Sequence, residues 1–297
     1  MKYNWIYLLL GGLMTLYACS SDDAPEQIPE PTPTEPTFNK ADSLALTEIY
    51  KQGDGANWEV TWDLTDIMSW GGTSWALDTD KNEYRCVMLR IMAKDTGNGI
   101  ISPQIGELEY LYSLAIGGKT FGGEMPATIT NLKFLVSIDL RHTLLTKIPD
   151  DMFNENFTYV YIGENKRLGG SLPSSLTKLK GGYANNPERM FRVIYNAYTG
   201  EVPLIKNAFI SLEGNNLTSL PMELAGRFKA GEHYVSVIRN RLSGIIPDEV
   251  LKDTIRIWRF SGQAGLQQEG YGYSNMPSDE EIKKMIEKYK KDHPDFK

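Results

Sequence analysis

The chain has 297 residues, of which 41% are apolar, so it can bury a sizeable core. Its formal net charge of −7 at pH 7 argues against nucleic acid as the main partner, because phosphate binding requires a basic surface.

Residues 1–18 have the pattern of a secretory signal peptide, with a basic start and an apolar run from Trp5 to Leu16. The run is short of the roughly 20 residues that a membrane-spanning helix needs. The segment Leu16-Tyr17-Ala18-Cys19 resembles the lipobox of bacterial lipoproteins, whose cysteine becomes the acylated first residue of the mature protein. The resemblance implies a membrane anchor at Cys19. The alternative is an ordinary signal peptide followed by an incidental cysteine.

Residues 19–38 form an anchor and tether. Ser20 to Asp23 resembles the short acidic export tag of Gram-negative surface lipoproteins, which implies an outer-membrane lipoprotein exposed at the cell surface. Five prolines among Glu, Gln and Thr follow before Phe38, a composition that cannot build a core and disfavours helix. We expect a semi-extended tether that holds the folded part away from the membrane.

A repeat of about two dozen residues runs through the middle of the chain. Its prolines return at intervals of 23, 23, 24, 30, 18 and 26 residues, at Pro103, Pro126, Pro149, Pro173, Pro203, Pro221 and Pro247. The long interval followed by the short one indicates an insertion before Pro203, around Asn185–Pro187, and a trimmed copy after it.

Upstream of the prolines the chain repeats one phrase: two apolar residues separated by one position, then any two residues, then asparagine. The asparagines are Asn165, Asn196, Asn215 and Asn240, and Lys119 and Thr143 take that place in earlier copies. The apolar pair predicts a short strand whose buried face needs a neighbouring copy to cover it. Because an asparagine amide can satisfy backbone groups at the end of the strand, we expect a weaker ladder at Lys119 and Thr143.

These phrases resemble the plant-type leucine-rich repeat, with Leu108 to Ile116 matching its opening and Asn240 to Pro247 its closing. The resemblance implies an α/β solenoid, a right-handed curved array over residues 89–262 with a parallel sheet on the concave side. It also implies a helical amino-terminal cap over residues 39–88 and a carboxy-terminal cap helix within residues 263–297.

Both predicted caps contain helices. Asp42 to Tyr50 is an amphipathic pattern, and Ser278 to Glu281 is a capping box that opens a helix with Ile282 and Ile286 on one face. The four tryptophans within residues 58–75 favour a packed cap interior, because large aromatic residues fill irregular cores. The alternative is a platform for sugar rings.

Candidate catalytic and metal motifs are weak throughout. Asp78 to Asn82 begins like a calcium loop, but Glu83 and Leu89 stand where the turn glycine and the bidentate glutamate belong, so we expect a hairpin turn. The three histidines lack metal-ligand spacing, and no GxSxG, P-loop or GxGxxG sequence occurs. Cys86 is expected to be a small buried residue, without a disulfide partner once Cys19 is acylated. We therefore expect no enzyme activity, no cofactor and no metal.

Residues that flank the buried strand positions should point to the concave surface by alternation. They include Arg90, Asp139, His142, Glu213, Ser236 and Arg259, together with eight ligand-binding candidates: Arg141, Tyr161, Glu164, Arg192, Tyr195, Arg239, Arg256 and Trp258. Arginine and aromatic residues often dominate binding energy, although the arginines could instead pair with acids on adjacent strands. We expect a monomer that binds a protein or peptide, with an acidic glycan as second choice and a purely structural scaffold as the remaining alternative.

Overall fold

The computed structural model describes residues 35–181, 189–224, 235–237, 239–260 and 272–296. From Pro36 onward they belong to one compact unit. The predicted signal peptide, Cys19, most of the tether and the Asn185–Pro187 insertion lie outside the described residues. Within the described part, no helix has both the length and the apolar composition of a membrane span.

The amino-terminal cap begins with helix α1 (Lys40–Gln52), in agreement with the amphipathic pattern. The Asn39 side chain caps the helix by accepting a hydrogen bond from the Asp42 amide at 3.0 Å. The cap continues through the 3-10 helices η1 (Gly55–Asn57) and η2 (Ile67–Ser69) into strands β2 (Thr73–Asp78) and β3 (Glu83–Met92). Strands β2 and β3 pair antiparallel, which confirms the predicted hairpin turn.

Aromatic side chains fill the interior of this cap. Trp58, Trp62 and Trp70 are at most 5% exposed, and the Trp62 ring stacks on Tyr50 and on Trp70 with centroid distances of 5.3 and 5.1 Å. Each of these indole N–H groups donates to a backbone carbonyl. Buried rings present no face to a ligand, so these three tryptophans form the cap core and no sugar platform.

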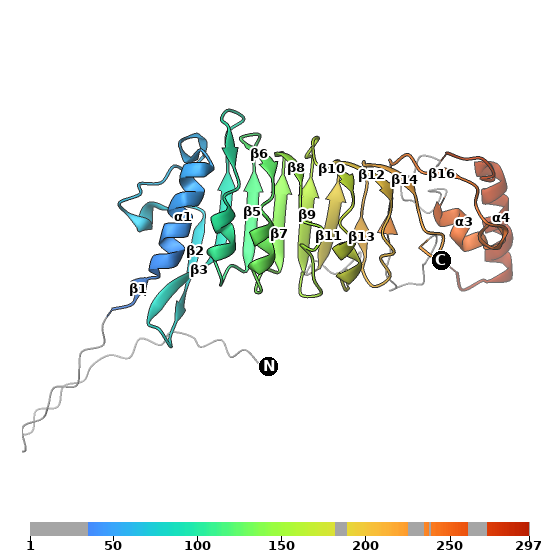
Figure 1. Ribbon diagram of the computed structural model, residues 1–297. Coiled ribbons are helices and arrows are strands. Elements are labelled where there is room, and N and C mark those ends of the chain that lie inside the picture. The colour runs from blue at the N-terminus through green and yellow to red at the C-terminus, as the bar shows by residue number, and fades with distance from the viewer. Residues whose placement is uncertain (1–34, 182–188, 225–234, 238, 261–271, 297) are drawn as a thin grey trace, which may run out of the picture. The chain divides into compact units, whose positions relative to one another are not determined.

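One parallel strand from each repeat builds a long sheet. Among the described residues its order is β1, β3, β5, β7, β9, β11, β13 and β15, with β2 on the side of β3, and Figure 1 shows the middle strands side by side in chain order. The remaining bounds are β1 (Thr37–Phe38), β5 (Ser113–Gly117), β7 (Ser137–Arg141), β9 (Tyr159–Gly163), β11 (Met190–Ile194), β13 (Ile210–Ser211) and β15 (Val235–Ser236). The last residues of the predicted tether thus pair with β3 as β1.

A second strand follows in each repeat, and these strands form separate short sheets. The first contains β4 (Gly99–Ile100), β6 (Phe121–Glu124) and β8 (Leu144–Lys147), the next β10 (Gly169–Ser171), β12 (Ala197–Glu201) and β14 (Asn216–Ser219), and the last β16 (Ser243–Gly244) and β17 (Gly272–Tyr273). The repeat prolines then lead into 3-10 turns, η3 (Pro103–Glu107), η4 (Ala127–Asn131) and η5 (Ser174–Lys178).

The spacing between a buried residue and its proline explains where the second sheet breaks. Four copies, from Phe121, Leu168, Tyr198 and Leu242, place the proline five residues later and carry a glycine with positive φ between the two. The copies that begin at Leu145 and Leu217 lack this glycine and place the proline four residues later. The second strand of a copy with the five-residue spacing pairs with that of a following four-residue copy, with a register shift between them. The second strand of a four-residue copy does not pair with that of the five-residue copy that follows it. The sheet therefore ends after β8 and after β14.

The predicted asparagine ladder connects successive repeats. The Asn165 amide donates to the Leu140 carbonyl at 3.0 Å, and its oxygen accepts from the Thr143 amide at 2.8 Å. Asn196 bonds in the same way to the Ile162 carbonyl, and Asn215 to the Val193 carbonyl. In the earlier copies, which lack the asparagine, other side chains make the contacts between repeats. Lys119 is exposed, and the buried Thr120 hydroxyl takes over contact with the preceding turn.

The carboxy-terminal cap corrects one part of the sequence interpretation. Residues Thr254–Phe260 form helix α3 and not the last strand of the long sheet, so Arg256 and Trp258 lie on a helix. Ile257 is fully buried, and α3 packs against α2 (Asp248–Leu251) and α4 (Asp279–Asp292). Ile255 and Ile257 alternate as in a strand, but three or four residues are too few to distinguish the two-residue period of a strand from the 3.6-residue period of a helix. The predicted capping box of α4 at Ser278 and Glu281 is confirmed.

Candidate binding face of the long sheet

Strand alternation divides the long sheet into a buried face and an open face. In β7, Ile138 and Leu140 are fully buried, whereas Asp139 and Arg141 between and after them reach solvent. Of the ligand-binding candidates, Arg141, Tyr161 and Arg192 lie at such outward positions on β7, β9 and β11. Strand geometry therefore gathers residues from distant repeats on one surface, which we call the open face.

A row of residues with positive φ borders the open face where the strands end. His142, Glu164, Tyr195 and Arg239 have φ values of 57°, 59°, 54° and 55°, and Gly118 and Gly214 occupy the same place in two other copies. Each stands directly before the residue at the asparagine position. Residues with a Cβ rarely adopt this conformation. The repeat imposes it here because the chain must turn sharply to bring the asparagine side chain back under the strand.

Three side chains of this border region form a polar cluster, the Tyr195–Glu213–Arg239 cluster. The Tyr195 hydroxyl donates to Glu213 at 2.5 Å, and the Arg239 guanidinium donates to the Tyr195 oxygen at 2.6 Å and lies 3.2 Å from the Glu213 carboxylate. The hydrogen bond to Glu213 raises the pKa of Tyr195, because it stabilises the protonated phenol. In the same row, the Glu164 carboxylate lies 3.3 Å from His142.

Arg141 is also engaged within the protein. Its guanidinium donates two hydrogen bonds to Asp139, at 2.6 and 2.7 Å, and lies 4.8 Å from the centre of the Tyr161 ring. The bonds to Asp139 raise the pKa of Arg141. The alternative interpretation of the arginines, pairing with acids of a neighbouring repeat, therefore holds for Arg239, whereas Arg141 pairs with an acid on its own strand. By contrast, Arg90 and Arg192 are exposed and form no side-chain ion pair within the described residues.

The open face is hollowed above β5. The outward residues of this strand, Ser113, Ala115 and Gly117, are small, while neighbouring β3 carries methionine and arginine and β7 carries arginine at the lining positions. The difference in side-chain size leaves a hollow of about 610 Å³. The residues that line it are Met88, Arg90, Met92, Tyr112, Ser113, Ala115, Ile116, Gly117, Ser137, Asp139, Arg141, Thr158 and Tyr159. We call it the β5 hollow.

Most of these lining residues were missed at the sequence level. Met88 and Tyr112 are 42% and 54% exposed, although both side chains are largely apolar. Only the run Ser113-Leu114-Ala115-Ile116-Gly117 signals the hollow, because its outward positions are all small. Of the eight candidates, the structure places Arg141 at the hollow, with Tyr161 against it, while Tyr195 and Arg239 belong to the cluster further along the face.

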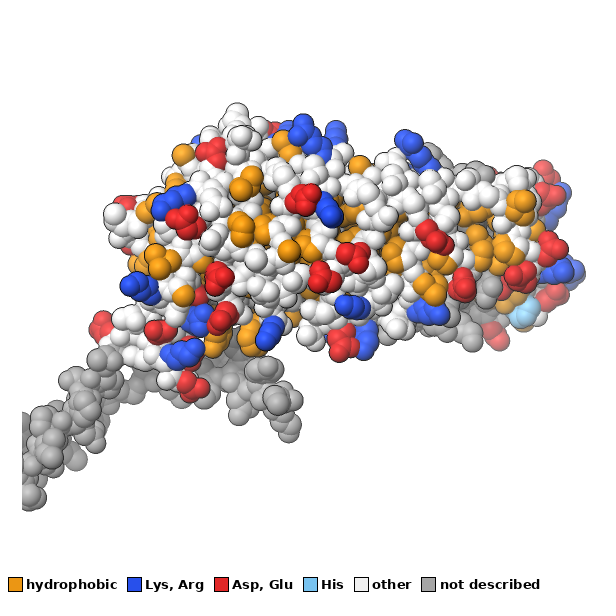
Figure 2. Space-filling view, viewed as in Figure 1, with side chains coloured by type: hydrophobic (Ala, Val, Ile, Leu, Met, Phe, Trp, Pro, Cys, Tyr) orange, Lys and Arg blue, Asp and Glu red, His pale blue; other side chains and the backbone are white. Residues whose placement is uncertain are grey.

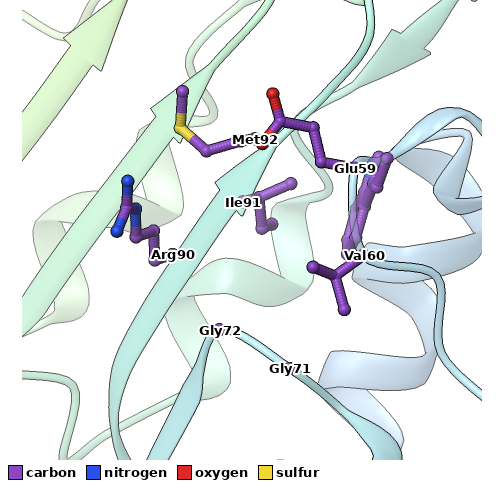
Figure 3. A pocket seen from close by; sticks show the side chains of 8 residues that line it. Glu59, Val60, Gly71, Gly72, Arg90, Ile91 and Met92 are labelled. Carbon is purple, nitrogen blue, oxygen red and sulfur yellow. The ribbon is translucent and has the colours of Figure 1, made fainter.

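A smaller cavity of about 260 Å³ lies between β3 and the cap. Figure 3 shows Arg90, Ile91 and Met92 on β3, with Glu59 and Val60 across the cavity and Gly71 and Gly72 at its rim. Both cavities are lined by Arg90 and Met92.

Charges of both signs are mixed on the face that Figure 2 draws. On the side drawn in Figure 2, lysine and arginine side chains alternate with aspartate and glutamate, without a large block of one sign. This face therefore lacks the continuous basic footprint of nucleic-acid binding.

Comparison with solved structures returns similar chains. The leucine-rich-repeat ectodomain of the receptor kinase SOBIR1 from Arabidopsis thaliana is 21% identical, with a TM-score of 0.47 over 63% of this chain and 98% of that one. A plant ice-binding protein is 21% identical, with a TM-score of 0.42 over 72% and 84% of the two chains. A leucine-rich repeat protein from Bacteroides eggerthii is 14% identical, with a TM-score of 0.34 over 68% and 58%.

No family model and no curated protein sequence matches the chain. The fold assignment rests on the features of the chain itself: one parallel strand per repeat, the buried asparagine ladder and the proline-led 3-10 turns. Together these features make the described part of the chain a leucine-rich-repeat α/β solenoid.

Proposed function

We propose that this chain is a binding module that holds a segment of a protein or peptide on its open face, at the β5 hollow. The observation that carries the proposal is the combination of exposed Met88 and Tyr112 with the unpaired Arg90 around a floor of small residues. Methionine and tyrosine offer adaptable apolar contact area, and arginine is a frequent anchor for carboxylates. The expected ligand segment carries an apolar side chain next to an acidic one.

The same composition favours binding over catalysis. No histidine or cysteine is among the residues that line the β5 hollow, and its Asp139 is held by two hydrogen bonds from Arg141. A nucleophile, a base and a group that orients the base are therefore not assembled in the hollow. An acidic glycan is the second candidate ligand, because Arg90 and Arg192 offer two unpaired cations on the open face.

Selection of random peptides by display on the full chain tests this proposal. Peptides with an acidic residue beside an apolar one should be enriched, and Ala115→Arg should abolish their binding by filling the hollow. Arg90→Ala should cost more than about 1 kcal/mol of binding free energy, as a hot-spot residue does. The exposed Lys133, outside the open face, provides a matched control in Lys133→Ala. Binding that survives Ala115→Arg at full strength would rule out the β5 hollow.

We further propose that the module is a monomeric outer-membrane lipoprotein, anchored through Cys19 and exposed at the cell surface. The support is the sequence Leu16-Tyr17-Ala18-Cys19 with the acidic residues and the proline-rich tether behind it. Several acyl chains on one residue give stable membrane attachment. Cys19→Ala should leave a precursor that incorporates no labelled fatty acid, and continued labelling of that variant contradicts the proposal.

A further inference from the structure

The second strands of the repeats enclose a groove on a different part of the solenoid. It has a volume of about 530 Å³ and lies at the break between β8 and β10. Its lining residues are Glu124, Thr146, Lys147, Ile148, Asp150, Arg167, Gly169, Gly170, Ser171, Pro173 and Tyr198. We call it the sheet-break groove.

The break leaves backbone groups of two strand edges without a strand partner. Strand β8 pairs only with β6, and β10 only with β12, so the adjoining edges of β8 and β10 do not form a ladder. Gly170, at a φ of +81°, has no heavy atom within 4 Å of the position where a Cβ would stand. The groove is therefore bordered by bare backbone beside open space.

Tyr198 is an unpaired polar side chain at this groove. It occupies the position that leucine takes in neighbouring copies, is 1% exposed, and lines the groove. Its hydroxyl makes no hydrogen bond within the described residues. Burial raises the pKa of Tyr198 well above its ordinary value, so the hydroxyl stays protonated and can donate as well as accept. Buried polar groups are normally satisfied, so this hydroxyl is left for a ligand in the groove, which reaches it when the Tyr198 side chain shifts, because the oxygen itself has almost no accessible surface.

The charged side chains that line the groove fall into two groups: one is already hydrogen-bonded within the protein, and the others are available to a ligand. Asp150 accepts hydrogen bonds from the amide of Ser174, at 2.7 Å, and from its hydroxyl. Lys147 and Arg167 are exposed and form no ion pair within the part of the chain that the structure describes, and Glu124 accepts no side-chain hydrogen bond there. Two cations and one carboxylate are thus available to a ligand.

We propose that the sheet-break groove binds an acidic saccharide. Its carboxylate or sulfate group would be bound by Lys147 and Arg167, and its hydroxyls by Tyr198, Glu124 and the free strand edges. The volume falls within the roughly 300–1,000 Å³ of small-ligand sites. The apolar lining residues Ile148 and Pro173 are themselves buried, so neither side chain is an open anchor for an apolar peptide side chain.

An extended peptide fits the groove less well. A strand inserted between β8 and β10 would need them about 9.5 Å apart, twice the usual spacing between strands. Their Cα atoms approach within 8 Å. The inference is independent of the function proposed for the β5 hollow, because the two sites have no residue in common.

Titration calorimetry of the full chain tests the proposal. The probes are trisaccharides that contain galacturonate, glucuronate or sulfated galactose, with a galactose trisaccharide as the uncharged control and triglutamate as the peptide anion. At least one acidic trisaccharide should bind saturably, and both controls more weakly. Lys147→Ala and Arg167→Ala should each weaken binding about tenfold, and Tyr198→Phe about fivefold. Lys133→Ala, outside both sites, should leave the affinity unchanged.

The melting temperature of Tyr198→Phe provides a second measurement. Loss of a hydroxyl that has no partner in the protein should leave it unchanged or higher. A lower melting temperature would show that the hydroxyl serves the fold and would overturn the proposal. So would failure of every acidic trisaccharide to bind, equal binding of triglutamate, or unchanged affinity in both Lys147→Ala and Tyr198→Phe.

Discussion

Arg85 on β3 and Asp42 on α1 form a two-point ion pair inside the amino-terminal cap. The guanidinium donates to the two carboxylate oxygens at 3.0 and 2.9 Å, and the side chains are 4% and 0% exposed. Asp42 also accepts from the Cys86 amide at 2.8 Å, and the guanidinium lies 4.2 Å from the centre of the Tyr110 ring. The hydrogen bond to Asp42 raises the pKa of Arg85. This pair fixes the cap helix to the first long strand of the array.

Asp42→Ala should lower the free energy of unfolding by about 3–5 kcal/mol, because it leaves the buried Arg85 charge with the exposed Glu109 carboxylate, 3.8 Å away, as its remaining partner. Urea denaturation measures the change. The double variant Asp42→Leu with Arg85→Met should recover most of the lost stability, because two buried apolar side chains need no opposite charge beside them. Glu48→Ala, which removes an exposed ion pair with Lys51, is the control and should leave the urea midpoint unchanged. Equal stability of Asp42→Ala and the parent chain would contradict the role of the pair.

Asn165→Ala should destabilise the array by roughly 2–4 kcal/mol, because it removes the hydrogen bond to Leu140 and leaves buried backbone groups unsatisfied. Asn240→Ala, at a part-buried position near the end of the ladder, should cost less. Thermal unfolding of the two variants measures which of them loses more stability. A larger loss for Asn240→Ala would show that the ladder does not act through burial.

Glu164→Gly should stabilise the chain by up to about 1 kcal/mol, because glycine adopts the positive φ of 59° without a steric cost. The lost contact with His142 is exposed on both sides and offsets little of this gain. The matched reverse change is Gly214→Ala, at a φ of 70°, where a Cβ would stand 2.4 Å from the Tyr195 ring. Chemical denaturation should show that the free energy of unfolding rises for Glu164→Gly and falls for Gly214→Ala. A change in the same direction for both variants would contradict the prediction.

Cys86 should be inert to thiol reagents in the folded chain. Burial, the largest cause, raises the pKa of its thiol to about 12, so the reactive thiolate is scarce at pH 8. Because the folded pKa lies above the unfolded one, the neutral thiol favours folding at pH values below about 8.5, and this contribution declines as the pH rises towards 12. Mass spectrometry after alkylation should find Cys86 modified only in denaturant. Labelling of the native chain at the unfolded rate would contradict its burial.

A glycine inserted between Thr146 and Lys147 should join β8 to β10. The insertion restores the five-residue spacing from Leu145 to the proline and supplies the glycine that has positive φ in the long copies. Amide hydrogen exchange in β8 and β10 should slow about tenfold or more as the strands pair. A glycine inserted after Thr218 should act likewise between β14 and β16. Unchanged exchange at both places would show that spacing does not control the break.

The sequence determined the repeat architecture, because the signals for it are local. An apolar pair at a spacing of two, an asparagine and an apolar-proline step recur in each copy, and stacking copies is the way to bury the apolar pairs. The capping box at Ser278 and the hairpin before Glu83 were equally readable, since each depends on a few neighbouring residues. The same local rule misassigned residues 254–260, where burial of Ile257 between helices decided the conformation.

Only the tertiary structure decided which polar residues are paired and where the surface is hollow. Asp42 and Arg85 are 43 residues apart in sequence, and nothing local marks their contact. Arg141 and Arg90 look alike in the sequence, yet one is held by Asp139 and the other is unpaired, because that difference depends on which side chains face each other across the sheet. The β5 hollow likewise arises from small residues in one repeat and large residues in its neighbours, a relationship that exists only once parallel strands set the copies side by side.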